Sequence, residues 1–238
     1  MQEKVINYYE NYDEEGRLFR DNAHMVEYLT SIHYFDKLFS PNSHILDACA
    51  GTGRYSFYLS KKGHTVTACD LVEHNVNIIK SNPEASRLND IKICNVLNLS
   101  EFEESSFDVV LCMGALYHLQ DNKERQKAVS ECVRVCKAKG IVVLSYIIDS
   151  EKPPDLSPDE NVFFSITPCE INKFAKTNRL DTIHNILTDG VINIIGSDKL
   201  NEANDEEFRK YMESYYLICE EPRVIMTGGH GLYIGRLL

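Results

Sequence analysis

A short apolar run that leads straight into a glycine-containing turn constrains this chain more than any other feature. The run is His44-Ile-Leu-Asp-Ala-Cys49, the turn contains Gly51 and Gly53, and a helical stretch near 53–62 ends at Gly63. Without a Cβ at Gly51 and Gly53, a ligand can approach the main chain closely, and the turn can use dihedral angles that other residues avoid. The segment therefore predicts a strand, a turn that can hold a ligand, and a helix.

Apolar runs alternate with amphipathic stretches from residue 44 onward, which is typical of strand, crossover and strand units. The expected strands are 44–49, 65–70, 91–94, 107–112, 141–148, 181–188 and 231–237. The expected helices between them are 53–62, 72–82, 121–140, 167–178 and 204–219. The run 141–148 is apolar throughout, as a central parallel strand buried on both faces tends to be. The pattern predicts an α/β fold that is doubly wound around a mostly parallel sheet.

The chain length and the lack of an internal repeat favour a single domain over residues 1–238. A chain of 238 residues is within the size that a three-layer α/β domain encloses with one core. Residues 1–40 carry helical patterning before any strand and are expected to pack over the sheet edge. The acidic, Pro-rich stretch 149–161 is expected to be a loop, so the chain divides into 1–40, a ligand-binding half 41–148, and a second half 149–238.

The charge balance argues against nucleic acid as a substrate. The chain has 25 Lys and Arg against 36 Asp and Glu, a formal net charge of -11, which repels a phosphate backbone over most of the surface. The N-terminus lacks the basic start and apolar core of a secretory signal. No apolar run approaches the roughly 18 residues of a membrane span. We therefore expect a cytoplasmic protein without a membrane partner.

The cysteines do not indicate a metal site. None of the eight forms a Cys-x-x-Cys pair, and in a reducing compartment they need not form disulfides. Cys132 and Cys136 could share a helix face and hold a metal ion, although such cysteines more often pack a core. Four cysteines fall at the ends of the first four expected strands, at positions 49, 69, 94 and 112. We expect them to fill space at the strand ends, and we expect no metal.

An acidic residue after the second strand points to a nucleoside-containing ligand. Asp70 lies 17 residues after Gly53, at the end of the strand 65–70, where this fold places a carboxylate beside a bound ribose. The third glycine of a dinucleotide fingerprint would fall at position 56, which is Ser56. The incomplete fingerprint argues against NAD and leaves a nicotinamide-dependent oxidoreductase as a secondary interpretation.

These residues resemble the class I S-adenosylmethionine-dependent methyltransferases, whose first motif is an apolar strand, an acid and a glycine-rich turn. The motif here is Leu46-Asp-Ala-Cys-Ala-Gly51-Thr-Gly53, and the resemblance spans roughly residues 40–148. It implies a seven-stranded Rossmann-like sheet with an antiparallel last strand, an N-terminal helical lid, S-adenosyl-L-methionine as cofactor, and methylation as the activity.

The resemblance also implies which positions touch the cofactor. Asp47 and the backbone of the glycine turn would face the methionine moiety, Asp70 would hold the ribose, and Leu71 would pack on the adenine. Asn95 stands where the family usually has an acid that binds the adenine amino group, and its side-chain oxygen can still accept that hydrogen bond. The full set is Tyr12, Asp47, Ala48, Ala50, Gly51, Gly53, Arg54, Asp70, Leu71, Asn95, Val96, Met113 and Gly114.

Tyr117 and His118 are the candidate catalytic residues. They follow the fourth strand in a segment similar to the one that opens on the substrate in this family. Histidine can act as a general base because its unperturbed pKa is near neutrality, but His118 could equally do no more than hydrogen-bond its loop. The lid residue Arg17 and His230, in the glycine-rich segment 227–231, are secondary candidates at the pocket mouth.

The sequence therefore predicts a methyltransferase, a transferase that acts on a small polar molecule. The acceptor atom is left open, because in-line transfer from a sulfonium requires alignment and exclusion of water rather than a fixed catalytic signature. A non-catalytic S-adenosylmethionine-binding module on the same fold is the principal alternative. The oligomeric state is left as monomer or homodimer.

Overall fold

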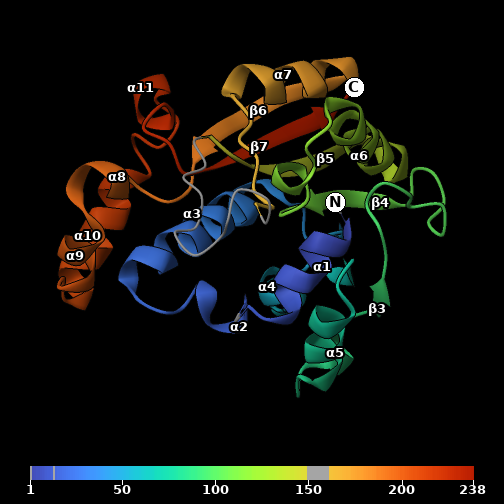
Figure 1. Cartoon of the computed structure of the whole chain (residues 1–238), viewed down its shortest axis with the longest axis horizontal. Coiled ribbons are helices and arrows are strands. Elements are labelled where there is room, and N and C mark those ends of the chain that lie inside the picture. Colours follow the sequence, from blue (N-terminus) through green and yellow to red (C-terminus); the bar gives the residue numbers. More distant parts are fainter. Residues whose placement is uncertain (1, 13, 149–160) are drawn as a thin grey trace.

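A single seven-stranded sheet organises the chain in the computed structural model, which describes residues 2–12, 14–148 and 161–238 (Figure 1). Its strands are β1 His44–Asp47, β2 Thr65–Asp70, β3 Asp90–Ile93, β4 Phe107–Cys112, β5 Cys136–Ile147, β6 Leu180–Leu187 and β7 His230–Leu237. Their order across the sheet is β3-β2-β1-β4-β5-β7-β6, and only β7 runs antiparallel to its neighbours. The predicted doubly wound fold with an antiparallel last strand is confirmed.

Two hydrophobic clusters cover the two faces of the sheet, because neighbouring residues of a strand point to opposite sides. Ile45 and Val109 belong to one cluster with α3 Asn22–Leu38, α4 Arg54–Lys61, α5 Glu73–Ser81 and α10 Asp205–Tyr215. Leu46 and Val110 belong to the other, with α6 Asn122–Val135 and α7 Pro168–Thr177. Buried strands with apolar residues at consecutive positions explain why the sequence shows continuous apolar runs rather than alternation.

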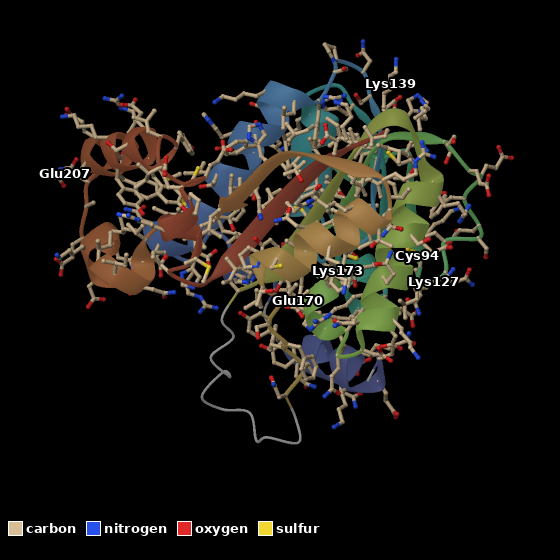
Figure 2. The ribbon with its side chains drawn as sticks, turned by 90° about the horizontal axis from the view of Figure 1, so that it is seen from above. Cys94, Lys127, Lys139, Glu170, Lys173 and Glu207 are labelled. Atoms are coloured by element: carbon tan, nitrogen blue, oxygen red, sulfur yellow. The ribbon has the colours of Figure 1, made fainter. Side chains whose placement is uncertain are left out.

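The N-terminal helices and the C-terminal half add to this core at opposite ends. Helices α1 Gln2–Glu10 and α2 Glu14–Arg17 lie beside α4 and α5 (Figure 1). The short helices α8 Ile192–Ile195, α9 Ser197–Asn201 and α11 Pro222–Ile225 gather with α10 at the other end. In Figure 2, Glu207 of α10 lies far from Cys94 at the end of β3 and from Lys127 of α6. The loop predicted over 149–161 lies outside the described residues except for Asn161.

Helix caps mark several of the predicted boundaries. Thr167 and Glu170 form a reciprocal capping box at the start of α7, with Pro168 at its first position. Asp121 caps α6 by accepting a hydrogen bond from the Lys123 amide. No helix of the described residues is long and apolar enough to cross a membrane.

The predicted boundary between the third helix and the fifth strand is wrong. The third predicted helix was placed to end at Gly140, but α6 ends at Val135 and β5 begins at Cys136. Cys136 pairs with Phe107 of β4, and after an irregularity the register continues with Ile141 beside Val109. Tertiary pairing with β4 therefore overrides the helical periodicity at this point.

Candidate cofactor and substrate site

A cavity of about 1100 Å³, including its open mouth, lies at the carboxyl ends of β1, β2 and β4. This is the edge where open α/β sheets bind ligands. The core contributes Ala48, Cys49, Ala50, Gly51, Thr52, Arg54, Tyr55, Asp70, Leu71, Val72, Asn75, Cys94, Asn95, Val96, Met113, Gly114, Ala115, Tyr117, His118, Leu119 and Ser145. The N-terminal helices contribute Gln2, Val5, Tyr9, Glu14, Arg17, Leu18 and Glu27. The cavity is therefore closed on one side by the predicted lid.

The glycine turn and Asp70 meet directly in the cavity wall. The Gly51 amide donates a hydrogen bond of 2.7 Å to Asp70 Oδ2, while the Val72 amide and the Asn75 side chain donate to Oδ1 at 2.9 and 3.2 Å. Burial raises the pKa of Asp70 to about 6, against the opposing effect of the bonds from Val72 and Gly51. Gly51 has φ +52°, and a Cβ added to it would first meet Glu14 Cγ at 3.6 Å. The turn thus presents bare main chain toward the lid.

Asn75 brings an unpartnered polar atom to the same wall. Its Oδ1 is buried and has no hydrogen-bond partner among the described residues, although its Nδ2 is bonded to Asp70. A buried polar atom without a partner is costly in a native structure. Asn75 was not among the predicted site residues, because the only sequence signal is its place in the first turns of α5 after Asp70.

Asp47 and Gly53 do not line the cavity, although the sequence predicted both as cofactor contacts. Asp47 is buried and accepts a 2.6 Å hydrogen bond from Ser56 Oγ. Burial raises the pKa of Asp47 to about 7 despite that bond. Gly53 has φ +86°, and a Cβ there would come within 3.0 Å of Ile79 and Phe57. Both residues pack on the side of the turn that faces away from the cavity. Their predicted contact with a ligand stays a prediction.

The remaining predicted contacts divide between the wall and its surroundings. Leu71, Asn95, Val96, Met113 and Gly114 line the cavity together with Ala48, Ala50 and Arg54. Tyr12 is not in the wall, and its ring stacks on Tyr8 at 5.3 Å. Of the four strand-end cysteines, Cys49 and Cys94 line the cavity, whereas Cys69 and Cys112 are buried among apolar side chains.

A network of ion pairs joins α2 to α3 within the lid. Arg17 donates to Glu14 at 3.0 Å and to the two oxygens of Glu27 at 2.6 and 3.3 Å. Burial alone would lower the pKa of Arg17, but Glu27 and Glu14 outweigh it and raise the pKa well above its usual value. Glu14 and Glu27 were not predicted as site residues, because acidic residues on N-terminal helices resemble an ordinary solvated face.

His230 and Asp189 extend this network of ion pairs from Glu27 to the start of β7. The start of β7 lies beside the end of β5, with His230 in register with Ile147 as expected for an antiparallel last strand. His230 Nδ1 lies 2.9 Å from Asp189 Oδ2 and 4.0 Å from Glu27 Oε2. Burial opposes protonation, but Asp189 and Glu27 raise the pKa of His230 to about 9. The imidazole is therefore charged at neutral pH.

Glu27, Asp189 and His230 could also hold a metal ion, since their ligand atoms lie within 4.8 Å of one another. Arg17 donates to the same Glu27 oxygen that faces His230. Arg17 and protonated His230 thus already place two positive charges among these acids. The expectation of no metal ion stays a prediction.

His118 is held at both ring nitrogens. Nδ1 lies 2.7 Å from the Val162 carbonyl oxygen, and Nε2 lies 3.0 Å from the Tyr9 hydroxyl. Burial lowers the pKa of His118 to about 4, so the ring is neutral near pH 7. Because a carbonyl can only accept, Nδ1 carries the proton and Nε2 accepts from Tyr9. Tyr117 lines the cavity next to His118, with ring centroids 4.7 Å apart.

Comparison with known proteins agrees with this architecture. Residues 46–144 match the family described as Methyltransferase domain. A ubiquinone biosynthesis O-methyltransferase from Coxiella burnetii is 29% identical over 97 residues, which are 41% of this chain and 40% of the relative. The chain thus spans about two fifths of the length of the curated relatives that it matches.

Solved structures share the fold over nearly the whole chain. A putative methyltransferase from Haloferax volcanii, in complex with the Trm112 methyltransferase activator, aligns with a TM-score of 0.64 and 17% identity, covering 97% of this chain and 96% of that one. The 1,6-didemethyltoxoflavin-N1-methyltransferase of Burkholderia thailandensis, solved with S-adenosylhomocysteine, aligns with a TM-score of 0.61 and 16% identity, covering 99% and 86%. Over residues 46–144 and in its fold, the chain resembles the class I S-adenosylmethionine-dependent methyltransferases.

Proposed function

We propose that this protein is a methyltransferase that uses S-adenosyl-L-methionine to methylate a small molecule held between the lid and the core. The observation that carries the proposal is the meeting of Gly51, Asp70 and Asn75 in one cavity wall. Bare main chain, a carboxylate and an unpartnered amide oxygen suit a ligand that brings hydroxyl donors, as a ribose does.

The other side chains of the cavity fit the rest of this cofactor. Leu71, Val72 and Val96 supply an apolar surface for an adenine ring. Asn95 Oδ1 accepts from the Leu97 amide at 2.9 Å and retains a second lone pair for a ligand donor. Arg17 reaches the cavity from the lid and can pair with a carboxylate such as that of a methionine moiety. The bound cofactor would supply an electrophilic methyl group.

Several features support a small acceptor rather than a macromolecule. The lid closes one side of the cavity, and the net charge of -11 opposes polyanions. Two of the three similar proteins named above are, by their names, an oxygen and a nitrogen methyltransferase of small molecules. Tyr117 and His118 face the same space and are the candidate residues at the acceptor.

Replacing Asp70 tests the proposal. We expect Asp70→Asn to weaken S-adenosylhomocysteine binding by roughly 30- to 100-fold, because a charge-assisted hydrogen bond contributes about 2–3 kcal/mol. Isothermal titration calorimetry measures the dissociation constant. The exposed Asp181→Asn on β6 is the matched control and should bind like the wild type. Wild-type protein that binds neither S-adenosylmethionine nor S-adenosylhomocysteine would contradict the proposal, and binding without turnover of any acceptor would favour the non-catalytic alternative.

A further inference from the structure

A tyrosine of the lid helix reaches the candidate catalytic histidine. Tyr9 lies on α1 and His118 on the 3-10 helix η2, Leu116–His118, so their 3.0 Å contact joins residues 109 positions apart in the chain. The rings meet edge to face, with centroids 5.5 Å apart. The contact places Tyr9, and not His118 alone, at the lid side of the cavity.

The partners of His118 fix the direction of this hydrogen bond. Nδ1–H donates to the Val162 carbonyl, so the Nε2 lone pair must accept the Tyr9 hydroxyl proton. His118 therefore cannot accept a proton from a substrate at Nε2 while Tyr9 stands in front of it. A general base that acts directly, as the sequence predicted for His118, is blocked in this closed arrangement.

The Tyr9 oxygen can still accept a hydrogen bond. Its hydroxyl proton is used toward His118, and its oxygen lone pairs remain available on a residue that lines the cavity. Burial, reinforced by nearby Tyr117, raises the pKa of Tyr9 well above its usual value. The phenol therefore keeps its proton until another proton reaches the oxygen.

We propose that the Tyr9 hydroxyl contacts the nucleophilic atom of the acceptor and relays its proton to His118, so that the acceptor is a molecule with a reactive O–H or N–H group. This inference rests on the proposed function and names the acceptor class for the same site. Tyr9 is the residue that touches the acceptor, and His118 acts through it. An acceptor without such a hydrogen, for example a thioether, would leave the pair unused.

The relay balances in atoms and charge. The acceptor's O–H or N–H bond breaks and its bond to the methyl carbon forms, while the sulfur–carbon bonding pair stays on sulfur. The acceptor proton goes to Tyr9 Oη, and the original Tyr9 proton goes to His118 Nε2. One positive charge is lost at sulfur and one appears on His118, whose Nδ1–H and Nε2–H both keep an acceptor, the Val162 carbonyl and the Tyr9 oxygen. Loss of the neighbouring positive charge favours the imidazolium that forms.

Tyr8 offers a matched control on the same helix. Its ring stacks on Tyr12 and meets Phe163 edge to face, with centroids 5.3 Å apart in each case. It is not among the residues of the cavity wall. Tyr8→Phe therefore removes a neighbouring hydroxyl from α1 without touching the relay.

The experiment compares Tyr9→Phe, His118→Asn and Tyr8→Phe with the wild type, using 3,4-dihydroxybenzoate and benzylamine as acceptor probes and S-adenosylhomocysteine release as the readout. At pH 7 we expect Tyr9→Phe to lower kcat on the phenol by about 100-fold, within the usual range of general acid–base catalysis. Tyr8→Phe should stay within threefold. The deficit should shrink to less than fivefold as the pH approaches the pKa of the acceptor's own phenol, because an acceptor that is already ionised no longer needs the relay.

Two further measurements keep the outcomes separate. The affinity of Tyr9→Phe for S-adenosylmethionine should stay within threefold of the wild-type affinity. A wild-type protein that does not bind S-adenosylmethionine would contradict the proposed function, and the relay with it. Nitrogen-15 spectra of histidine-labelled protein should show neutral His118 protonated at Nδ1 at pH 6, whatever the acceptor. A different tautomer, a pH-independent deficit in Tyr9→Phe, or a wild type that binds cofactor but methylates neither probe overturns the inference.

Discussion

The residues of the glycine turn have different roles, although they form one motif in the sequence. Gly51 donates its amide to Asp70 and faces the lid across the cavity. Gly53 is packed against Phe57 and Ile79 and serves the turn itself. Ser56, which breaks the dinucleotide pattern, donates to the buried Asp47. The residue that argued against NAD therefore has a structural role of its own, the pairing of a buried carboxyl.

Gly51→Ala tests whether the cavity needs bare main chain at this position. We expect binding of S-adenosylhomocysteine to weaken at least tenfold, because a Cβ directed toward Glu14 would enter the space between turn and lid. The positive φ adds a stability cost of about 1 kcal/mol. Isothermal titration and urea unfolding measure the two effects separately.

Gly196→Ala is the matched control for Gly51→Ala. Gly196 also has a positive φ, +80°, and a Cβ there would meet nothing within 4 Å. The control should lose at least as much stability, because φ +80° with ψ 146° is a conformation that almost only glycine adopts, and its affinity should be unchanged. Equal affinities for the two variants would mean that the ligand does not approach the Gly51 Cα.

At the scale of whole elements, the sequence indicated most of the strands and long helices correctly. β2 and β4 have the predicted bounds, and α7 begins within one residue of its predicted start. The failures occur where periodicity is short or tertiary pairing dominates, as at the start of β5. Helices α8, α9 and α11 have only four or five residues each, too few for a helical period to show.

The candidate site divides in the same way. Positions that follow a strand, such as Asp70, Asn95 and His118, could be predicted because strand order places them at one edge. Tyr9 and Glu27 could not, because only the folded lid brings α1 and α3 to that edge. Tyr12 belongs to the same aromatic segment, but it lies in the bend after α1, where its ring stacks on Tyr8.

The lid depends on Arg17, so Arg17→Gln should loosen it. The substitution leaves Glu14 and Glu27 without their shared cation, and breaking a buried or half-buried pair by removing one partner is strongly destabilising. We expect amide hydrogen exchange in residues 2–21 to become at least tenfold faster, with little change in β1, β4 and β5. Arg20→Gln, an exposed arginine on the same segment, is the control. Equal amide exchange rates in residues 2–21 of the two variants would show that the ion pairs of Arg17 do not hold the lid in place.

For the whole molecule, the buried Asp47, Asp70 and His118 and the half-buried His230 should set the pH dependence of stability. Raised pKa values of Asp47, Asp70 and His230, about 7, 6 and 9, mean that the folded state binds protons more tightly than the unfolded chain. Their contribution is complete below the unfolded pKa values and is lost as the pH rises through the folded ones. His118 has a pKa lowered to about 4 and acts in the opposite direction, but only below about pH 6.5.

Stability without cofactor should therefore fall as the pH rises from 6 to 9. We expect the unfolding midpoint Tm to drop by roughly 5 °C over this interval, given about 2–4 °C per kcal/mol for a chain of this size. Differential scanning calorimetry at pH 6, 7.5 and 9 measures it. His230→Asn should remove the part of the slope between pH 7.5 and 9, since the remaining groups have already lost their protons there. A midpoint that is flat or rising from pH 7.5 to 9 would mean that the network of Glu27, Asp189 and His230 is open to solvent, because over that interval the slope comes from the protonated His230 held between those two acids.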